Sequence, residues 1–292
     1  MATTAAAATD PAPTTAVAAE PSAFSREVRR RRALRRMSQL ELATLAGTTQ
    51  RHLSFIESGR SVPGRAMVVR LAESLGLSLR ERNSLLLAAG YAPAYAESPR
   101  DGASVEPAMT ALRSILTGHL PYPAVVAGTR GELVLANAAF DVLTEGAAAH
   151  LLAPPVNVLR LALHPEGMAP RVVNLASWGR HIVESLRVRA TAHPDPELDA
   201  LIVELSGHLP AMAPPGPDHL GFAVPLRLRC AEGELRLLTT LTSFATAVDV
   251  TLAELHLEAF LPADAATCDL LRRREEGRTG GTPPGAPAVR AG

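Results

Sequence analysis

The chain has 292 residues, of which 47% are apolar and only 3% aromatic, so it can form about two folded units with cores of Leu, Val and Ala. Its 29 basic residues balance 29 acidic ones, which excludes a nucleic-acid-binding protein that is basic over its whole surface. Two cysteines exclude a disulfide framework, and the longest apolar run, at 237–248, is shorter than the roughly 20 residues of a membrane helix. We therefore expect a soluble, cytoplasmic protein that does not contact membranes.

The charges are unevenly distributed along the chain. Residues 24–90 hold 13 Arg against 5 Glu, a net charge of +8, whereas residues 91–271 hold 11 Arg against 20 acidic residues. Such asymmetry suggests that the basic part binds a polyanion and that the acidic part does not. With the Ala/Thr/Pro-rich start and the Pro/Gly-rich junction and end, the expected organisation is a disordered tail at 1–23, a basic domain at 24–90, a linker at 91–106, an acidic domain at 107–274 and a disordered tail at 275–292.

Local signals in the basic segment predict five short helices. The first covers 25–36, and Ser38 and Glu41 form a capping box that starts the second, which Gly47 ends. Thr48 or Thr49 then caps a third helix that runs to Ser58. Two further helices follow at 65–75 and from Ser78 to 89.

This order resembles the helix-turn-helix fold of lambdoid phage repressors and of the xenobiotic response element family. The resemblance covers about 24–89 and rests on the strings Ser38-Gln39-xx-Leu42-Ala43-xxx-Gly47, Thr49-xxx-Leu53-xx-Ile56-Glu57-xx-Arg60, Pro63 and Leu71-Ala72-xx-Leu75. It implies a third helix in the major groove of a double-stranded DNA operator, with base edges read by its first turn. It also implies a buried ion pair between Arg32 and Glu57.

In that frame Gln50 matches an adenine edge and Arg51 a guanine edge, and Phe55 a thymine methyl, while Gln39, Arg60 and Arg65 match phosphates. The predicted DNA-binding residues are Gln39, Thr49, Gln50, Arg51, His52, Ser54, Phe55, Arg60 and Arg65. The alternative is that the arginines form a solvated face and that the helix pair docks a protein. The first helix has few apolar anchors, which predicts looser docking on the core than in the phage proteins.

The acidic segment predicts an α+β order. A helix at 107–117 precedes a hairpin around Thr129-Arg130-Gly131, helices follow from 137, and a second hairpin surrounds Glu232-Gly233 between 222–230 and 234–245. The apolar pattern at 252–260 fits a strand or a helix. The fold class is therefore mixed, with an all-α helix-turn-helix domain followed by an α+β domain.

The acidic segment resembles a PAS-like sensor and, more narrowly, the MmyB-like ligand-binding domain. The strings are Asn157-Val-Leu-Arg160-xxx-His164-Pro165, Val173-Asn174 before Trp178, Asp195-Pro196-Glu197-Leu198, Val224-Pro225-Leu226-Arg227, Gly233-Glu234-Leu235-Arg236 and Leu261-Pro262-Ala263-Asp264. That domain commonly follows a xenobiotic-type helix-turn-helix. The resemblance implies a transcription regulator whose sensor holds a small hydrophobic ligand, with a fatty acyl compound as the expected kind. Because one recognition helix reads only a few base pairs, we also expect the protein to act as a homodimer.

The predicted ligand-binding residues are Asn137, Phe140, Arg160, His164 and Trp178. Each also has a structural interpretation: the aromatic residues as core, Asn137 as a helix cap, and the two cations as groups that favour a helix C-terminus. A domain that only dimerises or binds a partner is the alternative function.

We expect no enzyme, because nucleotide-binding, metalloprotease and serine-hydrolase motifs are missing from the sequence. We also expect no cofactor and no metal site, because the nine His are scattered along the chain.

Overall fold

The structure is a computed structural model that describes residues 21–210, 223–244 and 246–280. The chain divides into two compact units, Met1–Gly76 with Ser84–Ala92 and Leu77–Asn83 with Pro93–Gly292. Residues 1–20 and 281–292 of the expected tails lie outside the described residues, as do Phe222 and Ala245 of the two strands expected in the second hairpin. None of the described helices is long and apolar enough to cross a membrane.

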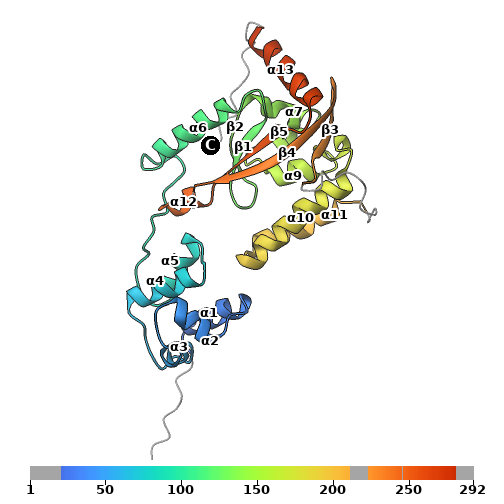
Figure 1. Ribbon diagram of the computed structural model, residues 1–292. Coiled ribbons are helices and arrows are strands. Elements are labelled where there is room, and N and C mark those ends of the chain that lie inside the picture. The colour runs from blue at the N-terminus through green and yellow to red at the C-terminus, as the bar shows by residue number, and fades with distance from the viewer. Residues whose placement is uncertain (1–20, 211–222, 245, 281–292) are drawn as a thin grey trace, which may run out of the picture. The chain divides into compact units, whose positions relative to one another are not determined.

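The first unit is helical (Figure 1), and the predicted order of helices is confirmed. Its helices are α1 (Ala23–Leu34), α2 (Gln39–Leu45), α3 (Gln50–Glu57), α4 (Arg65–Ser74) and the second half of α5 (Leu79–Ala88). Apolar residues at helical spacing meet in one core, where the side chains of Leu42, Leu53, Ile56, Leu71 and Leu75 are fully buried.

Polar caps explain where these helices begin. The side chains of Ser38 and Thr49 accept the backbone N–H groups of Glu41 and His52, each at 3.1 Å. These bonds satisfy amides that have no partner inside a helix. Gly47 has a φ of 62°, a left-handed conformation that costs glycine little, and it ends α2 before α3 starts.

Helix α1 packs on the core of the first unit through apolar side chains and hydrogen bonds. Phe24 and Val28 are 3% and 0% exposed, and they supply the apolar anchors. The guanidinium of Arg35 also donates to the backbone carbonyls of Leu75 and Gly76. Two buried side chains and a clamp to the end of α4 therefore hold a helix that carries many arginines.

The second unit is α+β, as predicted. Before the second hairpin it contains α6 (Glu106–Gly118), β1 (Ala124–Ala127), β2 (Leu133–Ala136), α7 (Asp141–Thr144), α8 (Ala149–Leu152), α9 (Val158–Leu163), α10 (Leu175–Ala192) and α11 (Pro196–Gly207), with short 3₁₀ turns at Ala138–Phe140 and Ala169–Arg171. It continues with β3 (Leu226–Cys230), β4 (Gly233–Ser243), α12 (Val250–Ala253), β5 (His256–Pro262) and α13 (Ala265–Gly280).

The strands form one antiparallel sheet in the order β2-β1-β5-β4-β3, with helices on both faces (Figure 1). Alternate residues of a strand point to opposite faces, and β1 shows this directly. Ala124 and Val126 pack with Met109, Leu112 and Leu116 of α6 on one face. The other face, which we call the inner face, carries Val125, Leu235, Leu237 and Phe260 and packs against side chains of α7, α9, α10 and α11.

The structure differs from the sequence interpretation in three places. The ambiguous stretch at 252–260 is a short helix, α12, followed by the central strand β5. Helix α13 was not predicted; the carboxylate of Asp264 accepts the Thr267 N–H at 2.8 Å, and Leu270 and Leu271 are buried. It extends to Gly280, beyond the expected domain end at 274. In the expected linker, the Ala96 carbonyl accepts the Val250 N–H at 2.8 Å, so this segment packs on the second unit.

Candidate nucleic-acid interface and sensor site

The first turn of α3 presents polar side chains to solvent. Thr49, Gln50 and Arg51 are exposed, while Leu53 and Ile56 on the opposite side of the helix are buried. A helix with this division can enter a major groove with Gln50 and Arg51 toward base edges. The assignment of these residues to bases stays a prediction.

Phe55 lies between two cations in the free protein. The guanidinium carbon of Arg51 is 5.5 Å from the Phe55 ring centroid, and that of Arg60 is 4.6 Å away. Arg60 also donates from Nε to the Ser58 hydroxyl at 3.0 Å. These cation–π contacts orient both arginines toward the same exposed surface, and a thymine methyl would have to reach the ring between them.

His52 and Ser54 lie beside this surface and are half-buried. The Nδ1 of His52 is 2.9 Å from the Thr48 hydroxyl, which fixes its ring against the turn that precedes α3. Arg65 is exposed at the first position of α4, where Gly64 offers no side-chain cap. Free amides and a cation at a helix start favour an anion such as phosphate.

The predicted ion pair between Arg32 and Glu57 is confirmed. Arg32 Nε and Nη2 donate to the two carboxylate oxygens at 2.7 and 2.9 Å, and the Glu57 side chain is only 3% exposed. The amide nitrogen of Gln39 donates to the same carboxylate at 2.8 Å. Burial alone would raise the pKa of Glu57, but these hydrogen bonds and the charge of Arg32 hold it below its ordinary value.

Glu57 is one of six residues that line a hollow of about 230 Å³ in the first unit. Arg29, Arg32, Gln39, Ser54 and Ser58 form its walls. Arg29 was not among the predicted DNA contacts, and its proximity to Gln39 comes from the packing of α1 on α3. We add Arg29 to the candidate phosphate contacts because it lies beside the predicted contact Gln39.

Three predicted ligand residues have structural partners in the second unit. Asn137 accepts the Ala124 N–H at 3.1 Å and donates to the carbonyls of Leu116 and Tyr122 at 3.1 and 2.9 Å. Phe140 and Trp178 belong to the apolar cluster on the inner face of the sheet, and Trp178 is 5% exposed.

The two predicted cationic ligand residues, Arg160 and His164, have different partners. Arg160 forms a two-pronged ion pair with Glu204 of α11, with distances of 2.7 and 2.8 Å. His164 is the C-cap of α9 and faces the rings of His150 and His208. A shared carboxylate site for Arg160 and His164 stays a prediction, and Arg160 would have to leave Glu204 to join it.

The inner face of the sheet is uncovered at one end. In the first part of β4, Leu235 and Leu237 are fully buried on this face. Farther along the strand, Thr239, Leu241 and Ser243 point to the same face and are exposed. Leu241 pairs across the sheet with Glu258. At this end Leu241 is 63% exposed and lies between the polar residues Thr239 and Ser243 along the same face of β4.

Arg189 of α10 is a charged group that the sequence interpretation missed near this end. It donates from Nη2 to the Thr129 carbonyl, and its buried Nε has no partner among the described residues. Burial lowers the pKa of Arg189, while the charge of Glu258 opposes that shift. A buried guanidinium with a spare donor can receive an anionic ligand group.

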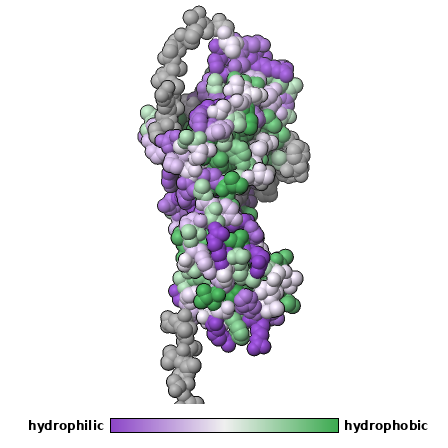
Figure 2. Space-filling view, turned by 90° about the vertical axis from the view of Figure 1, so that its left-hand side faces the viewer, coloured by the Kyte–Doolittle hydropathy of each residue, from purple (hydrophilic) through white to green (hydrophobic). Residues whose placement is uncertain are grey.

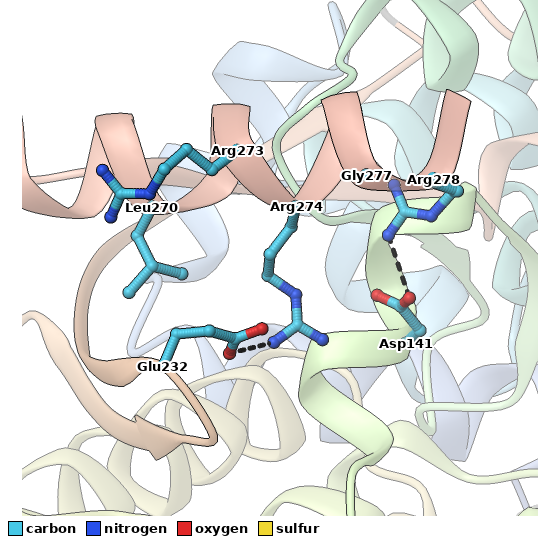
Figure 3. Close-up of a pocket in the computed structure, with 7 residues that line it drawn as sticks. All are labelled: Asp141, Glu232, Leu270, Arg273, Arg274, Gly277 and Arg278. Carbon is cyan, nitrogen blue, oxygen red and sulfur yellow. Dashed lines mark hydrogen bonds and ion pairs between the residues drawn. The ribbon is translucent and has the colours of Figure 1, made fainter. Parts of the chain in front are cut away.

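The second unit has a hollow of about 440 Å³ beside α13 (Figure 3). Arg274 reaches Glu232 and Glu145, each at 2.6 Å, and Arg278 reaches Asp141 at 2.9 Å. The surface at the level of α13 is hydrophilic (Figure 2). With these charges paired, the hollow suits a small polar molecule better than an apolar one.

Two family models match the chain. A helix-turn-helix model matches residues 28–82, and the model of the MmyB-like transcription regulator ligand binding domain matches residues 108–273. No curated protein matches the sequence. A solved RNA-binding light-oxygen-voltage receptor is similar, with 17% identity over 88% of this chain and 64% of that receptor and a TM-score of 0.27. The chain thus covers less than two thirds of that receptor, and so low a score does not indicate a shared function.

Proposed function

The chain belongs to the family of MmyB-like transcription regulators, and we propose that it binds a DNA operator through α3 and responds to a small hydrophobic ligand. One observation carries the proposal: a helix-turn-helix with an exposed Gln50-Arg51 start precedes the family's ligand-binding domain in one chain. DNA contact by the first unit is also consistent with its excess of Arg over Glu. Since a chromosomal operator is its partner, we expect it to act in the cytoplasm.

We further propose that the protein reads its operator as a homodimer. A single recognition helix contacts only a few base pairs, so useful specificity requires two half-sites about 34 Å apart. DNA footprinting with the full-length protein should then reveal an inverted repeat, and sedimentation should give two chains per operator. A preferred site bound by one chain, with no inverted repeat, would refute the dimer.

For the ligand, we propose a fatty acyl compound that lies along the uncovered end of the inner face. The exposed side chain of Leu241 supports an acyl chain there, and the apolar cluster that contains Phe140 and Trp178 lies on the same face of the sheet. The unpartnered Nε of Arg189 supports an acidic head group, because a carboxylate would satisfy that buried donor. The negative charges of Glu258, Glu132 and Asp195 favour the positive form of Arg189.

Mass spectrometry of lipids extracted from purified protein tests this assignment. We expect a carboxylic acid with an apolar chain, bound by the intact protein and weakened by Arg189→Gln. The matched control is Arg187→Gln, which removes an exposed cation of the same helix, whose Nη2 donates to the Ser206 hydroxyl. A protein that carries and binds no such compound would instead support a C-terminal domain that only dimerises.

A further inference from the structure

Three histidines and a glutamate meet on the surface of the second unit, and they come from three separate stretches of the sequence. The rings of His150 and His164 have centroids 5.7 Å apart, and those of His164 and His208 are 4.9 Å apart. One ligand atom each from His150, His164 and Glu166 lies within 4.8 Å of the other two. The spacing of these residues along the chain predicts no metal site, because His150 comes close to His164 and Glu166 only in the folded protein.

Backbone hydrogen bonds hold the segments that carry these side chains. The Ala148 N–H donates to the Glu166 carbonyl at 2.8 Å, which ties the start of α8 to the loop after α9. The Gly167 N–H donates to the His164 carbonyl at 2.9 Å and closes that loop. A side chain at Gly167 would collide with the Leu161 carbonyl, with its Cβ at 2.3 Å, so this tight turn requires glycine. The relative positions of the ligand-bearing residues are thus fixed before any ion binds.

The electrostatic setting favours a cation. His208 is the C-cap of α11, and the C-terminal end of a helix carries partial negative charge. Glu204 is held by Arg160, whose hydrogen bond is the main reason that the pKa of Glu204 lies below its ordinary value. Glu166, in contrast, is exposed and has its carboxylate 3.9 Å from Nε2 of His150. Its negative charge is therefore available to an ion.

We propose that His150, His164 and Glu166 bind a divalent transition-metal ion, with Zn²⁺ as the best match. Zn²⁺ binds imidazole nitrogen as well as carboxylate oxygen, whereas hard cations prefer oxygen ligands alone. Three protein ligands leave the fourth coordination position of Zn²⁺ for water. Ligand atoms around a tetrahedral Zn²⁺ lie about 3.3 Å apart. The ligand atoms of these three side chains, two exposed and His164 half-buried, are already within 4.8 Å of one another, so they need only small rotations to bind an ion. His208 packs edge-on against His164 and limits the orientations of that ring.

Metal binding requires the loss of one hydrogen bond of His164, and this loss lowers the affinity for the ion. Nδ1 of His164 accepts the Glu166 N–H at 3.0 Å, which places the proton of the neutral ring on Nε2. Because a neutral imidazole has a single free nitrogen lone pair, the ring must give up this hydrogen bond to ligate a metal. We therefore expect micromolar affinity rather than that of a preformed structural zinc site.

Isothermal titration of untagged, EDTA-treated full-length protein with ZnCl₂ tests the site. We expect one equivalent to bind, and we expect His150→Gln and Glu166→Gln each to weaken binding at least about tenfold. The control is His181→Gln, which removes an exposed histidine of α10 outside the cluster and should leave binding unchanged. Circular dichroism checks that each variant is folded, which is expected because both substituted ligands are exposed.

Co²⁺ provides a second readout that does not depend on a change in heat. Binding in a four-coordinate site should produce visible absorption, and this absorption should disappear in His150→Gln but persist in His181→Gln. Absence of saturable Zn²⁺ binding, or equal affinities for the His150→Gln and His181→Gln proteins, would overturn the proposal. The test is independent of DNA or lipid binding, so the proposed function can stand or fall separately.

Discussion

At the scale of single residues, the two arginines that flank Phe55 should differ in what they contribute to operator binding. Arg51 belongs to the exposed first turn of α3, whereas Arg60 follows the helix. We expect Arg51→Ala to cost about 1–3 kcal/mol and to relax preference at one base pair. Arg60→Ala should weaken all sequences alike and reduce the slope of log affinity against log salt by about one. Binding selections on randomised operators over a range of salt concentrations measure both effects.

Phe55→Leu serves as the control for these two variants, because it removes the ring on which both guanidinium groups stack and keeps both charges. It should alter preference less than Arg51→Ala does. Uniform losses over all base substitutions for Arg51→Ala would show that Arg51 contacts phosphate and does not read a base.

The ion pair between Arg32 and Glu57 should matter for stability more than for DNA recognition. Arg32→Ala leaves a carboxylate that is 3% exposed without its cation, and breaking such a pair costs about 3–5 kcal/mol. Some of this cost is recovered here because Gln39 still donates to Glu57. Native-state hydrogen exchange of amides in α1 and α3 measures the change. The double variant Arg32→Met with Glu57→Leu should regain most of the lost protection, and equal losses in the single and double variants would contradict this account.

At the scale of elements, α1 should lose stability in acid. The pKa of Glu27 is lowered from 4.5 to about 2, chiefly because Arg30 donates a hydrogen bond to it, and partial burial only partly opposes that shift. The folded state therefore favours the charged carboxylate, and the unfolded chain takes up the proton first. The resulting stabilisation is present above about pH 4.5 and is lost as the pH falls toward about 2.

Hydrogen exchange of α1 amides, corrected for intrinsic rates, measures this loss over the same pH range. Glu27→Gln should show a weaker dependence on pH, while the acid-dependent part that comes from Glu57 remains. Protection of α1 that stays constant or rises on acidification would contradict the assignment.

The elements also show which parts of the fold are predictable from the sequence. Ser38, Thr49 and Gly47 act on their own neighbours, so the limits of α2 and α3 can be read locally. Helix α13 has a comparable cap at Asp264, but its charged sequence carries only two buried leucines. Strand β5 is central in the sheet, and its pairing with β1 and β4 is a long-range property that periodicity does not contain.

The same reasoning explains the candidate sites. The α3 surface is one short stretch of sequence, and its exposed residues follow from helical periodicity. The apposition of Arg189 with Glu258, or of His150 with His164, joins elements that only the packed fold brings together. Asn137, predicted as a ligand contact or a cap, makes no side-chain cap bond to the 3₁₀ turn that follows it and links β1 to the end of α6 through three hydrogen bonds; its contact with a ligand stays a prediction.

At the scale of the whole molecule, ligand and operator should influence each other's binding. A ligand changes operator affinity only if it binds the competent and incompetent forms unequally, and typical coupling is about 1–3 kcal/mol, or about 5- to 150-fold. Thermodynamic reciprocity requires the operator to change ligand affinity by the same factor. We expect titrations of dodecanoate with and without saturating operator to give two different constants, whose ratio equals the change in operator affinity at saturating dodecanoate.

Two substitutions on the inner-face site make this last prediction specific. Leu241→Asp places a charge on the exposed apolar surface, and Arg189→Gln removes the guanidinium with the unpartnered Nε, so both should weaken dodecanoate binding. Because neither residue belongs to the helix-turn-helix unit, operator affinity without ligand should stay near that of the unaltered protein. Dodecanoate should then shift operator affinity in these variants only at higher concentration. Identical dodecanoate constants with and without operator would show that the domain at 108–273 does not transmit this ligand's binding to DNA.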